Sequence, residues 1–528
     1  MRNTWWLTRP KRDLSLVPLT ITAMANVAEG ERWQGTASPV GLAVEAALRH
    51  EGLKGGNPRT KNDSGARTYR AWMRGLGLAF LDEERRFQLT LAGSALVQGE
   101  PPLPILKNQV LKFQLPSAVS TTGQSAVSPD FRVRPAVFIL QLLADHRLDG
   151  YVTQNDDIAK IACCYGVSNS QECVDDVVTR ILAYRQDGTA SLEPDYVQRF
   201  GGTSRTRDPD AKTVFANLID IANTFGNWLG YTQLITREPG TGRWEITSGA
   251  EPEVREVIAK ATKTPLITKP EDEENFQRRY GLTPGKRKDT RRLGAGRTVT
   301  SATVQEREIN AAFMRAASAQ IITRISPEIV ETISNETGYP KPTVERALSK
   351  TYRAGAVGTF IHSYAQMAFE SREKATDFEK ATAEIFRDIF QFQAEHIGQR
   401  GRVPDVVIAS ESEGYGALLD SKAYAKGYSL GISQQNRMRD YIDDYQSYAL
   451  TGDPLAFFTY VVADYKTTIN AQVKEVAETN GVPGSVITAR DIIRMVERHR
   501  TNPYTHAQIK DMLSLNRALT YEDLALAS

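Results

Sequence analysis

Apolar residues recur with a helical period along residues 211–229. They lie three or four positions apart and would form one face of a helix: Val214, Leu218, Ile221, Ala222 and Phe225. Two stretches with the composition of strands follow at 231–236 and 243–247, and Pro239-Gly-Thr-Gly242 between them is a strong turn signal. This part of the chain is therefore predicted to be a helix followed by a β-hairpin.

The same outline occurs earlier in the chain. A helix is predicted at 68–75, two short strands at 78–81 and 87–91, and the start of another helix at 92–97. A helix followed by a hairpin is the outline of a winged helix, whose helix often enters a groove of DNA. Such units also mediate contacts between proteins, and the pattern alone leaves both functions open.

Basic residues form two candidate surfaces for DNA. The first is on or beside the helix at 68–75 and consists of Arg67, Arg70 and Arg74. The second is the stretch 278–297, which holds eight Lys or Arg, including Lys286 and Arg287, and one acid, Asp289. Basic side chains that meet phosphates release counterions and add affinity without sequence preference. A solvated linker is the alternative interpretation of such a run.

The C-terminal part of the chain alternates between helices and strands. Helices are predicted at 377–396, 433–448 and 467–480, strands at 403–410, 416–424, 457–464 and 485–488, and helical segments in the tail. This order is typical of an α/β sandwich around a small mixed sheet. An apolar stretch at 135–143 predicts a core helix in the first half. The predicted fold class is multidomain α/β (α+β).

Length and composition fit a soluble chain of several domains. The 528 residues suffice for three or four domains, and 41% hydrophobic and 24% charged residues are ordinary values. No run of 18 apolar residues occurs and the first residues lack the apolar core of a signal peptide, so we expect a cytoplasmic protein without a membrane segment. The three cysteines, Cys163, Cys164 and Cys173, are too few for a disulfide framework and lack nearby His for a zinc site. Buried, unreactive thiols are expected.

One stretch resembles a phosphate-binding loop but is incomplete. Residues 281–286, Gly-Leu-Thr-Pro-Gly-Lys, are one position short of the P-loop spacing, and no Ser or Thr follows the lysine. We therefore expect no nucleotide cofactor and no ATP-driven motor.

Two carboxylates and a lysine are spaced to meet on neighbouring strands. Asp405 opens one strand, and Asp420 and Lys422 lie on the next. Because side chains alternate along a strand, Asp420 and Lys422 project from one face, and a hairpin would bring Asp405 beside them. Such oxygen ligands suit Mg²⁺, and the lysine would orient water or add positive charge near a phosphate. Asp-x-Lys alone also arises by chance on surface strands, so the surrounding residues decide the interpretation.

Those surrounding residues resemble a known family. The run 420–434, with Pro404-Asp405 before it, is similar to the FokI-type cleavage domains of type IIS restriction endonucleases. The similarity covers roughly residue 376 to the end and includes Met438, Tyr441 and Gln446. It implies a PD-(D/E)xK fold, Mg²⁺-dependent hydrolysis of DNA phosphodiesters, and cutting at a fixed distance from a bound site.

The resemblance also implies roles for single residues. Asp405, Asp420 and Lys422 match the catalytic positions of the family, the two aspartates as metal ligands. A glutamate from the preceding helix, Glu379 or Glu384, would complete the site. The choice stays open, because one residue is inserted between His396 and Pro404.

Segments of the N-terminal half resemble a second group, the AlwI-type endonucleases and related nicking enzymes. The similar segments are Trp5-Trp6, 77–84, 89–93 and 106–117. This resemblance implies winged-helix domains that recognise short asymmetric sequences in double-stranded DNA.

With one active site per chain, two copies are needed to cut both strands. FokI-type domains pair through the helix after the Asp-x-Lys strand, here residues 433–448. The opposite-charge pair of the family falls on Asn436 and Asp440 and is not retained. Arg437 lies three residues before Asp440 on the same helix face, so each would meet the other across a two-fold interface. A local pair within one helix is the alternative.

The sequence as a whole predicts a type IIS restriction endonuclease that acts on double-stranded DNA and forms a transient homodimer through its cleavage domain. Its expected parts are recognition domains at 1–117 and 118–268, a basic linker at 269–303, and a nuclease domain at 304–528. The alternatives are a strand-specific nicking enzyme, a DNA-binding protein with a relic nuclease fold, and a nuclease for methylated DNA.

Overall fold

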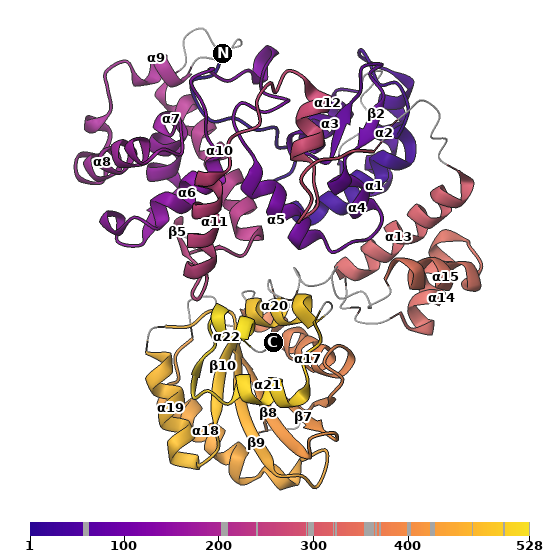
Figure 1. Cartoon of the computed structure of the whole chain (residues 1–528), viewed down its shortest axis with the longest axis vertical. Helices are drawn as coiled ribbons and strands as arrows, with labels where there is room; N and C mark the ends of the chain where they lie inside the picture. The colour runs from indigo at the N-terminus through magenta and orange to yellow at the C-terminus, as the bar shows by residue number, and fades with distance from the viewer. Residues whose placement is uncertain are drawn as a thin grey trace. The chain divides into compact units, whose positions relative to one another are not determined.

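The computed structural model divides into two compact units, Met1–Arg315 with Ile333–Thr351, and Ala316–Thr332 with Tyr352–Ser528 (Figure 1). The described residues are 1–55, 63–201, 210–238, 241–291, 293, 300–319, 322, 325–352, 364, 367–368, 371–398, 403–422, 428–466, 468–499 and 502–526. Among them, no helix is both long and apolar enough to cross a membrane.

The first helix–hairpin outline lies near the start of the first unit. The elements of this part are η1 (Leu14–Leu16), α1 (Val17–Ala28), α2 (Pro39–His50), α3 (Ser64–Gly75), β1 (Ala79–Leu81), β2 (Phe87–Leu89), α4 (Leu91–Val97), α5 (Pro102–Lys112) and η2 (Gly123–Ser125). β1 and β2 pair antiparallel, with Ala79 opposite Leu89. The predicted helix, hairpin and following helix are therefore present. A winged-helix fold for this part stays a prediction.

The segment after residue 269 packs against this helix–hairpin. α12 (Glu273–Tyr280) places the Glu273 carboxylate against the Arg74 guanidinium, with Nη2 and Oε2 2.6 Å apart. The buried Tyr280 ring approaches Gly77, where a Cβ would lie 2.7 Å from the ring and where φ is +71°, so glycine is needed for both reasons. α12 is therefore packed and not solvated, whereas the basic linker at 269–303 stays a prediction. Only Phe276 and Tyr280, one turn apart, make the helix apolar, and the surrounding charges mask them in the sequence.

The second helix–hairpin outline contains one strand more than the sequence predicts. Its elements are α6 (Pro135–Leu143), η3 (His146–Leu148), β3 (Tyr151–Thr153), η4 (Gln154–Ala162), α7 (Cys163–Tyr165), α8 (Gln171–Asp187), η5 (Gly188–Ser191), α9 (Tyr196–Gly201), α10 (Ala211–Tyr231), β4 (Ile235–Arg237), β5 (Arg243–Ile246) and α11 (Glu251–Lys263). The strands form one antiparallel sheet in the order β3-β5-β4. β3 escapes sequence prediction because three residues are too short to show alternation. α6 is buried along almost its whole length, as its apolar sequence predicts.

The three cysteines lie in this part. Cys163 and Cys164 are buried, and burial raises the pKa of both thiols, that of Cys164 to about 12. Cys173 is partly exposed, so the prediction of burial is wrong for this one residue.

The second unit is built on a six-stranded mixed sheet in the order β11-β10-β9-β8-β7-β6. Its elements and those that precede it are α13 (Ser301–Ala319), α14 (Pro327–Thr337), α15 (Lys341–Thr351), α17 (Ser371–Asp388), β6 (Gln393–His396), β7 (Val406–Ser410), β8 (Tyr415–Lys422), α18 (Ile432–Asp443), η7 (Tyr445–Ser447), β9 (Leu455–Val462), α19 (Ile469–Asn480), β10 (Gly484–Thr488), α20 (Ala489–His499), α21 (His506–Leu513), β11 (Arg517–Ala518) and α22 (Tyr521–Leu526). β8, β9, β10 and β11 run parallel, whereas β6 and β7 are antiparallel to their neighbours.

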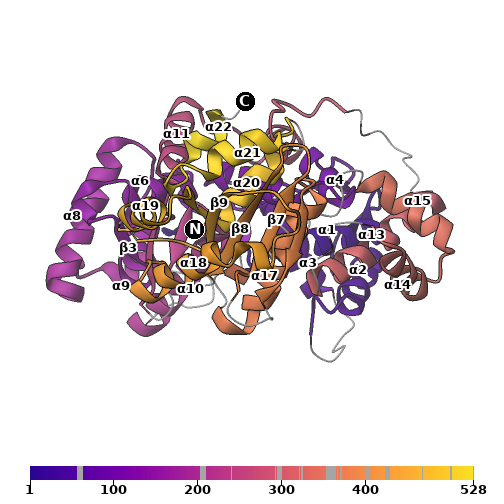
Figure 2. The ribbon, with the colours of Figure 1, turned by 90° about the horizontal axis from the view of Figure 1, so that it is seen from below.

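Helices cover both faces of this sheet. α18 and α19 close one face, where Leu418, Tyr460 and Val486 pack with Met438 and Val473. α21 lies on the opposite face, and the two sides are separate in Figure 2. The expected α/β sandwich around a small mixed sheet is present.

The end of the long helix differs from the prediction. The helical pattern was expected to run through 377–396, but α17 ends at Asp388 and residues 393–396 form strand β6. Gln391 adopts a left-handed φ of 65°, which breaks the helix. The buried rings of Phe390 and Phe392 continue the apolar pattern across this break, so periodicity alone misplaces the boundary.

Candidate active site

Asp405, Asp420 and Lys422 meet at the ends of β7 and β8. Val406 pairs with Leu419, so Asp405 lies beside Asp420 in the antiparallel ladder. The Lys422 Nζ is 2.7 Å from Asp420 Oδ2 and 3.6 Å from Asp405 Oδ2. The backbone N–H of Ser421 donates to Asp405 Oδ2 at 2.7 Å, which fixes that carboxylate from the neighbouring strand. Period-two alternation and one hairpin thus assemble the cluster.

Burial sets the electrostatics of this cluster. Removal from water and the nearby Asp420 carboxylate raise the pKa of Asp405 well above its usual value. Burial alone would lower the pKa of Lys422, but the carboxylates of Asp420 and Asp405 outweigh it and raise that pKa. Lys422 is therefore a fixed positive charge at neutral pH, and the crowded carboxylates favour any further cation.

Of the two candidate glutamates, Glu379 lies near Asp405, whereas the charge of Glu384 acts on a different residue. The Glu379 Oε2 is 2.9 Å from the His396 Nε2, and its charge contributes to the raised pKa of Asp405. A Cβ on Gly398 would lie 3.1 Å from Asp405 Oδ1 and 3.4 Å from Glu379 Oε2, so both carboxylates lie next to this glycine. Glu384 is five residues later, about 140° around α17, and its charge acts on Arg387 instead.

The donor set fits a hard divalent cation. Asp420 Oδ1 is buried and has no hydrogen-bond partner among the described residues, so one carboxylate oxygen is left for a cation. No group of three His, Cys, Asp or Glu side chains forms a closed metal cage in the described part of the chain. Mg²⁺ does not require one, because it is held by one or two carboxylates together with water and substrate phosphate. Asp405 and Asp420 are the residues that would hold it.

Two tyrosines that the residue pattern does not single out as site residues surround Asp420. Tyr460 on β9 is its direct partner across the parallel ladder, and the Tyr460 hydroxyl is buried without a partner among the described residues. Tyr441 on α18 lies close enough that burial and the Asp420 charge raise its pKa to about 12. Tyr441 stands in the family-like run, but its place beside the carboxylates follows only from the packing of α18.

The part of the chain that holds this site is similar to known proteins. Residues 338–520 match the family model described as FokI, cleavage domain. The C-terminal domain is similar to the FokI cleavage domain. The type II restriction enzyme FokI of Planomicrobium okeanokoites is 24% identical over 148 residues, a match that spans 25% of this chain and 25% of that enzyme.

Solved structures give a weak overall likeness. The structure of restriction endonuclease FokI has 14% identity, covers 98% of this chain and 100% of that one, and has a TM-score of 0.29. The structure of FokI bound to DNA has the same identity and coverage and a TM-score of 0.28. The BpuJ1 endonuclease binding domain in complex with modified DNA has 14% identity, 52% and 95% coverage, and a TM-score of 0.35.

The expected dimer residues of the FokI-like domain lie on the surface of α18. Arg437 and Asp440 are both exposed, and within the described residues no ion pair joins them in one chain. Ile432 at the start of the same helix is 77% exposed. The local pair that was the alternative interpretation is absent from this helix.

The basic residues expected to touch DNA lie outside the FokI-like domain. Some of them form contacts within the chain, and others are exposed. Arg74 pairs with Glu273, and Arg70 lies over the Trp33 ring at 4.6 Å and donates to the Trp33 carbonyl. Burial lowers the pKa of Arg70 to about 10. Arg67 is 3.1 Å from the Asp63 carboxylate. Arg70 and Arg74 thus stabilise the fold, whereas the other two candidates, Lys286 and Arg287, are exposed.

Proposed function

We propose that this chain is a type IIS restriction endonuclease. Its first unit would bind a short asymmetric site in double-stranded DNA, and its FokI-like domain would hydrolyse phosphodiester bonds outside that site. The convergence of Asp405, Asp420 and Lys422 carries the proposal, because two carboxylates and one ammonium at strand ends suit metal-assisted hydrolysis of a phosphodiester. Separate units make physical sense, since base contacts specify a site whereas the phosphates are alike everywhere.

The residues of the site would divide the chemistry. When bound by Asp405 and Asp420, Mg²⁺ supplies a Lewis acid that offsets the negative charge developing on the phosphate. Lys422 stays protonated beside Asp420, so its Nζ can donate to the phosphate or orient the attacking water. Glu379, held by His396 through its Oε2, borders Asp405 and would position that water. The dry environment strengthens each of these interactions.

Sequencing the ends of a digested plasmid tests the function. With Mg²⁺ present, we expect linear product whose ends lie at one fixed distance from a common asymmetric sequence. Open circles with one broken strand would indicate a nicking enzyme instead. Ends without a common sequence nearby, or no cleavage of any plasmid, would contradict the proposal.

Metal dependence should follow oxygen-ligand chemistry. Excess EDTA should stop cleavage, and Mg²⁺ or Mn²⁺ should restore it, because two carboxylates leave room for water and phosphate in an octahedral shell. Ca²⁺ should support DNA binding without comparable cleavage, since it prefers more ligands at longer distances. Gel electrophoresis of plasmid with each ion measures both effects. Undiminished cutting in EDTA would rule out this role for the aspartates.

The choice between the two glutamates gives a matched pair of variants. Glu379→Gln should lower the cleavage rate by about 10- to 100-fold, because the carboxylate beside Asp405 loses its charge. Glu384→Gln makes the same change on the same helix and should leave the rate near that of the unchanged chain. Equal losses in single-turnover cleavage would show that neither glutamate has a particular role.

A further inference from the structure

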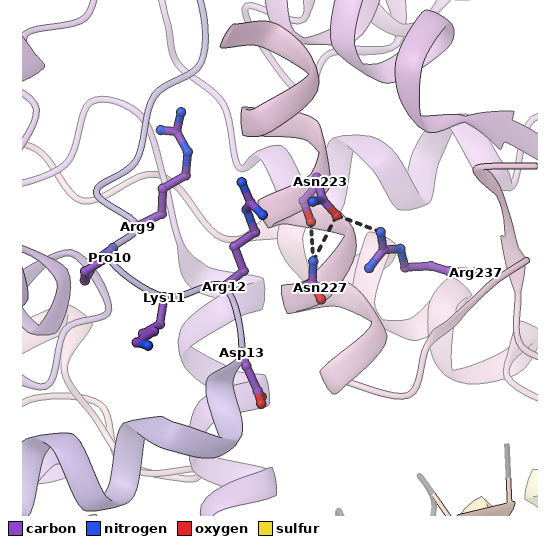
Figure 3. A pocket seen from close by; sticks show the side chains of 8 residues that line it. All are labelled: Arg9, Pro10, Lys11, Arg12, Asp13, Asn223, Asn227 and Arg237. Atoms are coloured by element: carbon purple, nitrogen blue, oxygen red, sulfur yellow. Dashed lines mark hydrogen bonds between the residues drawn. The ribbon is translucent and has the colours of Figure 1, made fainter. Parts of the chain in front are cut away.

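A basic pocket lies in the first unit, whereas Asp405, Asp420 and Lys422 belong to the second. The pocket has a volume of about 630 Å³, and the segment 9–13, α10 and Arg237 of β4 line it (Figure 3). Four of its side chains are basic: Arg9, Lys11, Arg12 and Arg237. Two asparagines of α10, Asn223 and Asn227, add amide groups. None of these residues was singled out by the sequence patterns.

The segment 9–13 is anchored so that part of its charge stays available. The Arg9 Nε donates to Asp220 Oδ2 at 2.7 Å, and its guanidinium lies 4.7 Å from the Trp6 ring centre. Arg12 also pairs with Asp220, yet 47% of its side chain is exposed. Lys11 has no hydrogen-bond or ion-pair partner within the described residues. The pocket therefore presents a free ammonium and a half-exposed guanidinium on a fixed backbone.

The opposite wall is a preassembled hydrogen-bond network. The Arg237 Nη2 donates to Asn223 Oδ1 at 2.8 Å and to Gln154 Oε1 at 2.7 Å. The Asn227 Nδ2 donates to the same Asn223 Oδ1 at 3.0 Å, as the dashed lines in Figure 3 show. The Asn223 amide N–H₂ and the Asn227 amide oxygen have no partner among the described residues. One donor and one acceptor are thus left over on adjacent turns of α10.

Close packing fixes this wall to the sheet. A Cβ on Gly226 would lie 2.4 Å from the Trp244 ring and 3.0 Å from the Arg237 Nε, so the glycine lets both side chains lie directly on α10. Arg237 also lies over the Trp244 ring, at 5.8 Å. The side chains that face the pocket are therefore held in place before any ligand arrives, which lowers the entropy lost on binding.

The geometry points to this pocket as a site that reads double-stranded DNA. Lys11 and Arg12 contact backbone phosphates, and the free Asn223 N–H₂ and Asn227 Oδ1 face a base edge, with Arg237 holding the Asn223 amide in place. One amide donor beside one amide acceptor matches the N7 and N6–H₂ of an adenine edge in the major groove, and lysine adds phosphate affinity. A small anion would require the cations but not the paired amides. The inference rests on the proposed function, because it assigns the recognition step of that enzyme to named residues.

Selection from a random duplex pool tests the site in the full-length chain. The probe is a 40-base-pair duplex with a randomised centre, bound by the Asp420→Ala chain so that the DNA is not cut. Lys11→Ala should weaken binding several-fold for all sequences and reduce the slope of log affinity against log salt by about 1. Asn227→Ala should instead reduce discrimination at one base pair of the selected sequence by about 10-fold.

A matched control distinguishes an effect of the pocket from a general effect of losing positive charge. Lys212→Ala removes an exposed lysine of α10 that does not line the pocket, and it should change neither affinity nor selected sequence. If Lys11→Ala and Asn227→Ala both select the same sequence with the parent affinity, the pocket is not the reading site, and the proposed function still stands. An equal loss with Lys212→Ala overturns the assignment as well. If the parent chain selects no sequence, both the pocket assignment and the proposed function fall.

Discussion

Asp420→Ala is expected to lower the cleavage rate by at least about a thousandfold while DNA binding stays within about twofold. The Asp420 carboxylate is 4% exposed, lies 2.7 Å from the Lys422 ammonium, and has one oxygen free for a cation. Losing several kcal/mol of charge stabilisation in the transition state corresponds to a loss of this size. Single-turnover cleavage and a gel-shift assay on the same DNA measure the two quantities.

Lys422→Ala should lower cleavage to a similar extent, for a different reason. Without the ammonium, the Asp405 and Asp420 carboxylates repel each other in a buried place, and one of them should take up a proton. Lys474→Ala, on the exposed part of α19, is the matched control and should cut normally. Loss of specific DNA binding together with cleavage in either catalytic variant would contradict the separation of reading and cutting between two units.

Arg437→Asp is expected to suppress double-strand cleavage by itself, and so is Asp440→Arg. In a two-fold interface, residue i meets j while j meets i, so each single variant places like charges opposite each other at two contacts. A mixture of the two variants restores both attractive contacts. Cleavage of both strands should therefore be slow for each variant alone and recover on mixing, with a rate that rises faster than linearly with enzyme concentration.

Arg439→Asp provides the control for that experiment. It makes the same charge change on α18 as Arg437→Asp. Arg439 lies two residues after Arg437 and so about 200° further around the helix. The Arg439→Asp variant should cut both strands as the unchanged chain does. Normal double-strand cleavage by Arg437→Asp and by Asp440→Arg would show that this pair is not the contact between copies.

Local periodicity predicts most elements of this fold, and it fails where local and tertiary signals disagree. α10 and its hairpin follow from the spacing of apolar residues and one turn signal. β6 does not, because its sequence, Gln-Ala-Glu-His, lacks apolar alternation and pairing with β7 alone makes it a strand. α12 was missed for the opposite reason, since strong surface charge surrounds the two rings that pack it.

In the candidate site too, local sequence patterns predict some neighbours, whereas tertiary packing decides others. The meeting of Asp405 with Asp420 and Lys422 could be predicted, because a short hairpin joins β7 and β8. The sequence could not show that Glu379, and not Glu384, lies near Asp405, because that depends on which face α17 turns toward the sheet. Tyr460 lies opposite Asp420 only through the parallel register of β8 and β9, which are joined by a long crossover, and no local pattern encodes that register.

The place of β8 within the sheet also bears on when the chain becomes able to cut DNA. Asp405, Asp420 and Lys422 have all been synthesised once the ribosome passes Lys422. The strands β9 and β10, which make β8 an interior strand, come later in the chain. Until they are added, β8 would be an exposed edge and Asp420 would lack the tyrosines of β9 and α18 around it. Pairing of parallel strands over such separations is slow and comes late in folding. A nascent chain therefore carries Asp405, Asp420 and Lys422 before β9 and β10 hold them in place.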